Sequence, residues 1–192
     1  MAEIQQTGQR YPDQGGYPNQ GNYPSNPPRG RVAFPSSRYR SYSEFGVLRV
    51  SVPDNWRELS EQGSVWFAPE GAYGSANGQT VFTHGMNFGA VQTRSRNLQQ
   101  ASNEFINSLE QGNGNLRARS DYQRTSISGR SALTISLSNT NEATGRSEII
   151  TVTTAQLRNG ELFYAITVSP DNDFNAYRGT FTNVLHSIQL LD

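Results

Sequence analysis

Cysteine is absent from the 192 residues of this chain. A disulfide scaffold, a zinc site with thiolate ligands and a cysteine nucleophile are therefore all excluded. The absence of cysteine does not indicate the cellular compartment, because chains without cysteine occur in both oxidising and reducing environments. Lysine is absent as well, so all 16 basic residues are arginine. We attribute this to genome composition rather than to a binding code.

The chain also lacks a net charge and a long apolar run. Its 16 basic and 16 acidic residues balance, which argues against electrostatic capture of nucleic acid. The longest uninterrupted apolar run is Leu162–Ile166, far shorter than the ~20 residues that a membrane helix needs. The N-terminus has no apolar segment typical of a signal peptide. We therefore expect no nucleic-acid partner and no direct membrane insertion.

Residues 1–40 have the composition of a disordered linker. They hold six of the nine prolines and a six-residue repeat that starts at Tyr11, Tyr17 and Tyr23. Such a segment cannot bury a core and favours coil and polyproline II. Its net charge is +3, which leaves −3 for residues 41–192. We predict a spacer to another module, with a partner-binding Tyr/Arg/Pro segment as the alternative.

Residues 41–192 are predicted to form one domain in which order begins near Tyr42. Gly85 lies inside a predicted strand and indicates a bulge or a close approach by another group. The segment 69–78 is too rich in glycine for regular structure. Alternating or β-branched segments predict strands over 47–52, 64–68, 80–88, 122–127, 131–138, 148–157 and 162–168.

The last two predicted strands form a hairpin around Asn159-Gly160. This dipeptide favours a type I′ turn, in which both central residues have positive φ. Both strands are apolar on both faces, whereas strands of a sheet with one solvent-exposed face would carry polar residues on that face. We therefore predict an α+β fold: an antiparallel sheet of about six or seven strands between two helices.

The first predicted helix runs from the N-cap Asn97 to about Gln111 and stops at Gly112. Gln100 occupies the capping-box position. The second is predicted to begin around Pro170, with Ser169 or Asp171 as its cap. Its apolar stripe consists of Phe174, Tyr177, Phe181, Val184, Leu185 and Ile188.

Several short motifs resemble the PsbP-like α/β/α sandwich over residues 42–191. They are Val50-x-Val-Pro-x-x-Trp56, Val65-x-Phe-x-Pro-x-Gly71, Gly129-x-x-Ala132, Gly160-x-Leu162-x-Tyr164 and the closing helix with Tyr177, Phe181 and Ile188.

A narrower resemblance rests on Ser37-Arg-Tyr-Arg40, Pro53-Asp-Asn-Trp56, Phe67–Gly74 and Thr83-His-Gly85. These segments are similar to the C-terminal accessory domain of some bacterial zinc metallopeptidases with tetratricopeptide repeats. The resemblance implies an accessory domain whose catalytic part is absent, since the chain has no His-Glu-x-x-His motif. We expect the bacterial cell envelope or periplasm rather than the cytoplasm.

Candidate reactive groups are few and scattered. His84 is a possible ligand or base, but a half-buried strand histidine is the simpler interpretation, because no second ligand lies at metal-binding spacing. His186 lies in the last turn of a predicted helix, where an imidazolium favours the helix dipole. A Gly-x-Ser-x-Gly elbow is absent. We therefore predict no catalytic residue, no metal and no cofactor.

The arginine pairs Arg94/Arg96 and Arg117/Arg119 are the other candidates. Alternate residues of an extended chain point to one side and could hold an acidic partner, whereas charge that protects a sheet edge is the rival interpretation. We expect a non-catalytic accessory or protein-interaction domain that meets a protein, or an adjacent domain, through a sheet edge or the 69–78 loop with Tyr73. The alternative is a small-ligand or divalent-ion binding module with His84 and that loop at its mouth.

Overall fold

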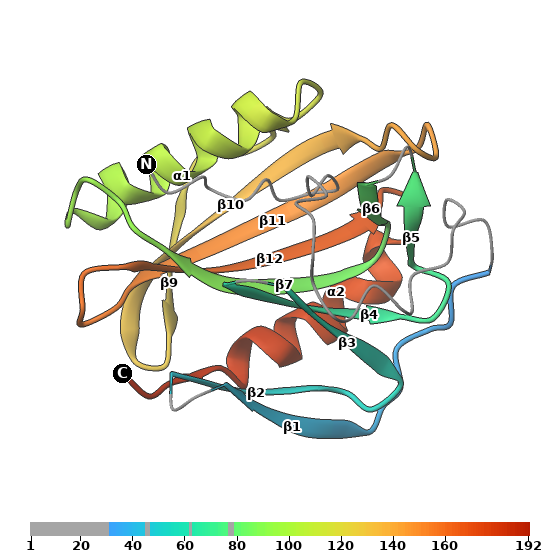
Figure 1. Ribbon diagram of the computed structural model, residues 1–192, viewed down its shortest axis with the longest axis horizontal. Helices are drawn as coiled ribbons and strands as arrows, with labels where there is room; N and C mark the ends of the chain where they lie inside the picture. Colours follow the sequence, from blue (N-terminus) through green and yellow to red (C-terminus); the bar gives the residue numbers. More distant parts are fainter. Residues whose placement is uncertain (1–30, 45–46, 62, 77–78) are drawn as a thin grey trace.

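The computed structural model describes residues 31–44, 47–61, 63–76 and 79–192 (Figure 1). Most of the predicted linker, residues 1–30, lies outside the described residues, so the division at residue 40 stays a prediction. Residues 31–40 contact the domain: the Tyr177 hydroxyl donates to the Ala33 carbonyl at 3.1 Å, and the Ser36 amide donates to Asn55 Oδ1 at 2.9 Å.

The centre of the fold is an eight-stranded antiparallel sheet. The strand β9 (Gln123–Ile127) pairs with β10 alongside β8 at one edge, and β3 forms the other edge. Across the sheet the order is β3 (Trp56–Glu61), β4 (Ser64–Pro69), β7 (Gly85–Val91), β12 (Leu162–Pro170), β11 (Ser147–Gln156), β10 (Arg130–Thr140) and β8 (Arg117–Ala118).

The two faces of this sheet are covered by different elements (Figure 1). Helix α1 (Leu98–Gly112) lies on one face. Helix α2 (Phe174–His186) lies on the other, together with a three-stranded sheet of β1 (Tyr39–Glu44), β2 (Leu48–Pro53) and β13 (Gln189–Leu190). The predicted α+β architecture, an antiparallel sheet between two helices, is confirmed, with one strand more in the main sheet than predicted.

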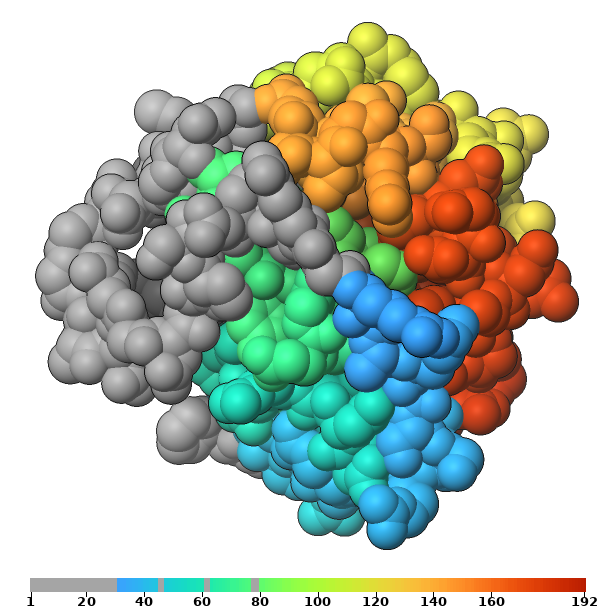
Figure 2. All heavy atoms as spheres, turned by 90° about the vertical axis from the view of Figure 1, so that its right-hand side faces the viewer, coloured from blue at the N-terminus to red at the C-terminus, as the bar shows by residue number. Residues whose placement is uncertain are grey.

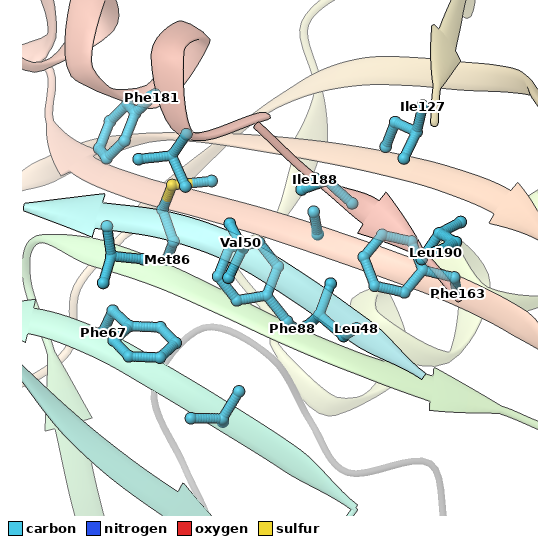
Figure 3. Packing of buried hydrophobic residues seen from close by; sticks show 14 of the residues in the cluster. Leu48, Val50, Phe67, Met86, Phe88, Ile127, Phe163, Phe181, Ile188 and Leu190 are labelled. Atoms are coloured by element: carbon cyan, nitrogen blue, oxygen red, sulfur yellow. The ribbon is translucent and has the colours of Figure 1, made fainter. Parts of the chain in front are cut away.

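Strand β12 shows why both faces are apolar, since all of its residues are buried. Phe163 and Ala165 belong to the core beneath α2, whereas Tyr164 and Ile166 belong to the core beneath α1. Successive side chains of a strand point to opposite faces, so β12 supplies both cores. Figure 3 shows the core on the α2 side, where Phe181 and Ile188 pack toward Val50, Met86 and Phe88.

The predicted strand 80–88 is divided in two. Strand β6 (Gln79–Phe82) pairs with β5 (Tyr73–Ala76) as a separate hairpin, so the segment predicted to be irregular is partly regular. The chain then turns at Gly85, where φ is +138° and an added Cβ would lie 2.4 Å from the Phe67 carbonyl oxygen. The close approach predicted at Gly85 is confirmed.

The turn at Asn159-Gly160 differs from the predicted type I′. Gly160 has a φ of +91°, whereas Asn159 is not among the described residues with positive φ. The turn is closed by bonds from the Leu157 amide to the Glu161 carbonyl (2.8 Å) and from the Gly160 amide to the Leu157 carbonyl (3.1 Å). A longer turn with a single left-handed glycine satisfies these groups, so the type I′ prediction is wrong.

Helix α1 begins as predicted, with Asn97 Oδ1 accepting from the Gln100 amide at 3.1 Å. The Gln100 side chain does not complete a capping box; it accepts from Ser95 Oγ at 2.7 Å instead. Helix α2 begins later than predicted, because β12 continues through Pro170 and Asp173 is the N-cap. In the described part of the chain, no helix is long and apolar enough to cross a membrane.

Candidate functional site

Two regions of the structure contain, or lie beside, residues singled out from the sequence. The first, the His84 corner, consists of Thr83, His84, Asp173 and Tyr177. The chain between β6 and β7 carries the first two, and the start of α2 carries the others. Figure 2 shows this end of the molecule, where the turn between β10 and β11 (orange), the start of α2 (red) and the first described residues (blue) border the segment after residue 80 (green).

Both ring nitrogens of His84 have partners. Nδ1 lies 3.0 Å from Thr83 Oγ1, and Nε2 lies 3.2 Å from Asp173 Oδ2. The Thr83 hydroxyl also lies 3.2 Å from the Ala72 carbonyl, which accepts from the Thr83 amide at 2.8 Å, so its single hydrogen has two acceptors within reach, that carbonyl and Nδ1. The Asp173 carboxylate can only accept, which places a proton on Nε2. We therefore assign a neutral imidazole whose Nε2–H donates to the Asp173 carboxylate.

Burial controls the protonation of this corner. It lowers the pKa of His84 below the ordinary 6.5 and outweighs the hydrogen bond and charge of Asp173, which act to raise it. Burial, with a smaller effect of Asp173, raises the pKa of Tyr177, whose ring lies 4.8 Å from the imidazole. Both groups are neutral at pH 7.

The His84 corner is closed to ligands. His84 is 3% exposed, more buried than the half-buried strand histidine of the sequence interpretation. Only Asp173 reaches the surface, with a side chain that is 39% exposed. Across the described ranges, no group of three or more His, Cys, Asp or Glu residues could hold a metal ion. The hydrogen bond between His84 and Asp173 therefore connects the start of α2 to the β6–β7 junction.

Tyr73 lies close to this corner but is buried. It occupies β5 opposite Phe82 and is 4% exposed. Its hydroxyl donates to Glu70 Oε2 at 3.1 Å, and Glu70 pairs with Arg57 at 3.2 Å. Burial raises the pKa of Tyr73, and the hydrogen bond to Glu70 adds to this effect.

The structure places the two arginine pairs at opposite ends of α1. Arg94 and Arg96 precede the helix, whereas Arg117 and Arg119 follow it in and beside β8. A helix of 15 residues separates them by about 22 Å. Arg119 pairs with Asp171 at 3.6 Å. Arg117 and Arg119 thus lie at an edge of the main sheet, as the rival interpretation of a charged, protected edge supposes.

The second region is a groove beside the start of α1, which we call the arginine groove. Its volume is about 430 Å³. The turn that carries Arg158 also contains Gly160, and an added Cβ there would lie 3.5 Å from Arg96 Nε. Arg96 of the predicted Arg94/Arg96 pair therefore lies beside the turn that carries Arg158. The groove is lined by Leu98, Arg130, Ser131, Gln156, Leu157 and Arg158.

Arg130 and Arg158 were not singled out from the sequence. The pairing of β10 with β11 sets Ala132 opposite Ala155, and this register brings Arg130 next to the residues that follow Gln156. The proximity of Arg130 and Arg158 was in principle predictable, because antiparallel pairing of 131–138 with 148–157 brings Arg130 to the turn that holds Arg158. The prediction would have required the register of the two strands, which the sequence alone did not provide.

One of the arginines that line the groove, Arg130, is already paired with a carboxylate of the chain itself. Asp192 contacts Arg130 through two oxygens, Oδ1 at 2.6 Å from Nη2 and Oδ2 at 3.0 Å from Nη1. The Arg158 amide also donates to Oδ2, at 2.7 Å. Burial tends to raise the pKa of Asp192, but these hydrogen bonds outweigh it and hold the pKa below 3.8.

The sheet order and the two covering helices define an α+β fold. No protein-family model and no curated protein matches the sequence. Among solved structures, the Ran-binding protein Mog1p of Saccharomyces cerevisiae has a TM-score of 0.56 and 10% identity, covering 82% of this chain and 97% of its own. CyanoP, the cyanobacterial PsbP of Synechocystis sp. PCC 6803, has a TM-score of 0.55 and 13% identity, covering 84% and 96%.

These likenesses establish the fold alone, because the sequence identities are low. They confirm the PsbP-like architecture expected from the motifs between residues 42 and 191. The narrower resemblance to the accessory domain of metallopeptidases stays a prediction, as do the partner surfaces expected at Tyr73, His84 and the arginine pairs.

Proposed function

We propose that this chain is a non-catalytic protein-interaction domain that meets its partner at the arginine groove. The observation that carries the proposal is the gathering of Arg96, Arg130 and Arg158 near the start of α1. Residues 41–192 have a net charge of −3, so this cluster is a local positive surface on an acidic domain. Such a surface orients an acidic partner as it approaches.

The state of His84 supports a non-catalytic role. A general base needs an accessible nitrogen within reach of a reacting group. Both nitrogens of His84 are engaged within the fold, and its side chain is 4% exposed. The second histidine, His186, ends helix α2 and is exposed. Neither histidine therefore has the surroundings of a reaction centre.

The fold is compatible with a role in protein binding. Mog1p, which has the same fold, is described as a Ran-binding protein. A fold does not determine a function. The likeness thus supports only the class of activity, and the arginine groove of this chain supplies the specific surface.

We extend the proposal to the parent protein on the strength of the sequence resemblance. Residues 1–40 would link this domain to the peptidase part of a bacterial zinc metallopeptidase of the cell envelope. Sequencing the DNA upstream of the codon for Met1 tests this extension. A reading frame that encodes a His-Glu-x-x-His motif supports it, and a stop codon directly upstream contradicts it.

Site-specific photo-crosslinking tests the interaction role. A photoreactive residue replaces Arg96 in the full chain, and the matched control carries it at Thr182, which is exposed on α2. In the native cells we expect a discrete cross-linked protein from position 96 and not from position 182. Replacing Arg158 by Gln should reduce its yield severalfold.

Two results would overturn the interaction proposal. One is equal cross-linking from positions 96 and 182. The other is a thermal-shift screen in which a metal ion or small molecule stabilises the protein and the effect disappears in His84→Ala. The second result would establish the alternative of a small-ligand or divalent-ion module.

A further inference from the structure

We propose that the arginine groove binds the carboxylate of an acidic, partly apolar peptide segment of the partner, and that Asp192 competes with it from within the chain. This inference rests on the proposed function and specifies the chemistry of the partner. It begins from the carboxylate that the groove already holds.

Several donors hold the carboxylate of Asp192 and together form a carboxylate receptor. Arg130 Nη1 donates to Oδ2 at 3.0 Å, and the Arg158 amide donates to the same oxygen at 2.7 Å. Arg130 Nη2 lies 2.6 Å from Oδ1 without hydrogen-bonding geometry and donates to the Asp192 main-chain oxygen at 3.3 Å. The planar guanidinium thus spans several oxygens, which a lysine ammonium cannot do. The Arg130 and Asp192 side chains are 20% and 12% exposed. The receptor is therefore partly sheltered, and any carboxylate of similar geometry can use it.

The receptor continues into space that Asp192 does not account for. The groove of about 430 Å³ has Leu98 and Leu157 in its lining, next to the two arginines. An apolar lining beside a guanidinium suits a peptide that carries an apolar side chain next to an acidic one. Leu157 is only 4% exposed, so the apolar surface open to a ligand beside Arg130 comes mainly from the half-buried Leu98.

Unpaired cations extend the same surface. For the described residues, no carboxylate oxygen lies within 4.0 Å of a guanidinium nitrogen of Arg94, Arg96 or Arg158. Arg96 lies beside Gly160, in the turn that carries Arg158. Arg96 and Arg158 thus add two further cations beside Arg130, and charge complementarity favours a peptide with more than one acidic side chain.

Exchange of one carboxylate for another costs little at such a site. Leaving Arg130 unpaired would strand a partly buried charge, whereas an incoming carboxylate replaces the same hydrogen bonds. Among the described residues, the Asp192 carboxylate contacts the Arg130 guanidinium and the Arg158 amide, and its own backbone amide also stabilises it. Rotating this side chain away therefore breaks no bond to a described residue other than these. Asp192 acts as an internal ligand that a partner has to displace.

Fluorescence anisotropy with the full chain tests the proposal. The probe is a fluorescein-labelled, C-terminally amidated hexapeptide, Leu-Asp-Leu-Asp-Leu-Asp, and the matched control peptide has Asn in place of each Asp. We expect Asp192→Asn to bind the acidic peptide about tenfold more tightly than the unmodified chain, because the internal competitor is removed. The control peptide should bind neither protein.

The groove variants complete the test. In the Asp192→Asn background, Arg130→Gln should lose at least about tenfold in affinity, and Arg130→Lys should recover part of it, because the charge returns without the fork. Arg158→Gln should lose severalfold and keep its backbone donor. Thermal melts of each variant ensure that only folded protein is compared.

Three outcomes would overturn the inference. They are an Asp192→Asn variant that binds no more tightly, an Arg130→Gln variant that binds equally well, and complete displacement of the peptide by succinate at an equal concentration. The last outcome would assign the site to small carboxylates. Cross-linking from position 96 would still stand in each case, so failure of this inference is distinct from failure of the proposed function.

Discussion

Helices α1 and α2 begin on different kinds of contact. The N-cap of α1, Asn97, accepts from the amide of Gln100 within its own first turn. The N-cap of α2, Asp173, makes no capping bond with its side chain, which binds His84 from 89 positions earlier in the chain. An N-cap residue can therefore bind a distant side chain instead of capping its own helix. Such a contact can be recognised only once the fold is known.

The cores beneath the two helices also differ in how distant along the chain their residues are. The core beneath α1 is built from α1, from the β5–β6 hairpin and from the main sheet. The core beneath α2 adds Leu48, Val50 and Leu190 from the three-stranded sheet. Val32 packs partly against both cores. The α2 side thus depends on segments from both ends of the described chain, and Tyr177 of the His84 corner bonds to the first of them at Ala33.

The largest effect on the α2 side is expected from Gly85→Ala. The new Cβ would lie 2.4 Å from the Phe67 carbonyl oxygen, at a φ of +138° that other residues rarely adopt. We expect a loss of about 3 kcal/mol or more in the free energy of unfolding. Gly145→Ala is the control, because φ is +69° and nothing lies within 4 Å, so only about 1–2 kcal/mol of backbone strain applies. Urea unfolding measures both; equal losses would contradict the prediction.

A smaller effect distinguishes the two N-caps. Asp173→Ala leaves the buried Nε2–H of His84 without its acceptor and should cost about 1–3 kcal/mol. Asn97→Ala removes a local cap and should cost about 1 kcal/mol. In NMR spectra, only Asp173→Ala should shift the ring resonances of His84. If Asn97→Ala moves them equally, the distinction between a local and a tertiary cap fails.

The smallest effect is a pH dependence of stability that arises from His84. Its folded pKa lies below 6.5, so the unfolded chain takes up a proton first as the pH falls. The stabilisation is complete above pH 6.5 and is progressively lost below it. Thermal melts between pH 7.5 and 5 should show a steeper fall of Tm for the unmodified chain than for His84→Gln. Parallel curves would show that this histidine does not titrate differently in the two states.

Much of the fold could be predicted because its signals are local. The hairpin of β11 and β12, the cap at Asn97 and the apolar stripe of α2 are all periodic patterns within a short window. The requirement for a helix on each face followed from the uniformly apolar β12. These elements needed no knowledge of distant residues.

The missed features depend on distant pairing. Strand β13 is two residues long and exists only because Gln189 and Leu190 pair with β2. The receptor at Arg130 appears only when the register of β10 with β11 is known. The contact of His84 with Asp173 was not predicted, because an aspartate at the start of a helix is usually explained by capping or by its favourable interaction with the helix dipole.

The pairing of β13 with β2 also sets an order of events during synthesis. Strands β10 to β12 and helix α1 can associate as soon as residues 98–170 have left the ribosome. The sheet under α2 cannot close until Leu190 has emerged and found Leu48. Until then the apolar side chains of β2 lack part of their packing, and transiently exposed apolar surface of this kind is prone to aggregation.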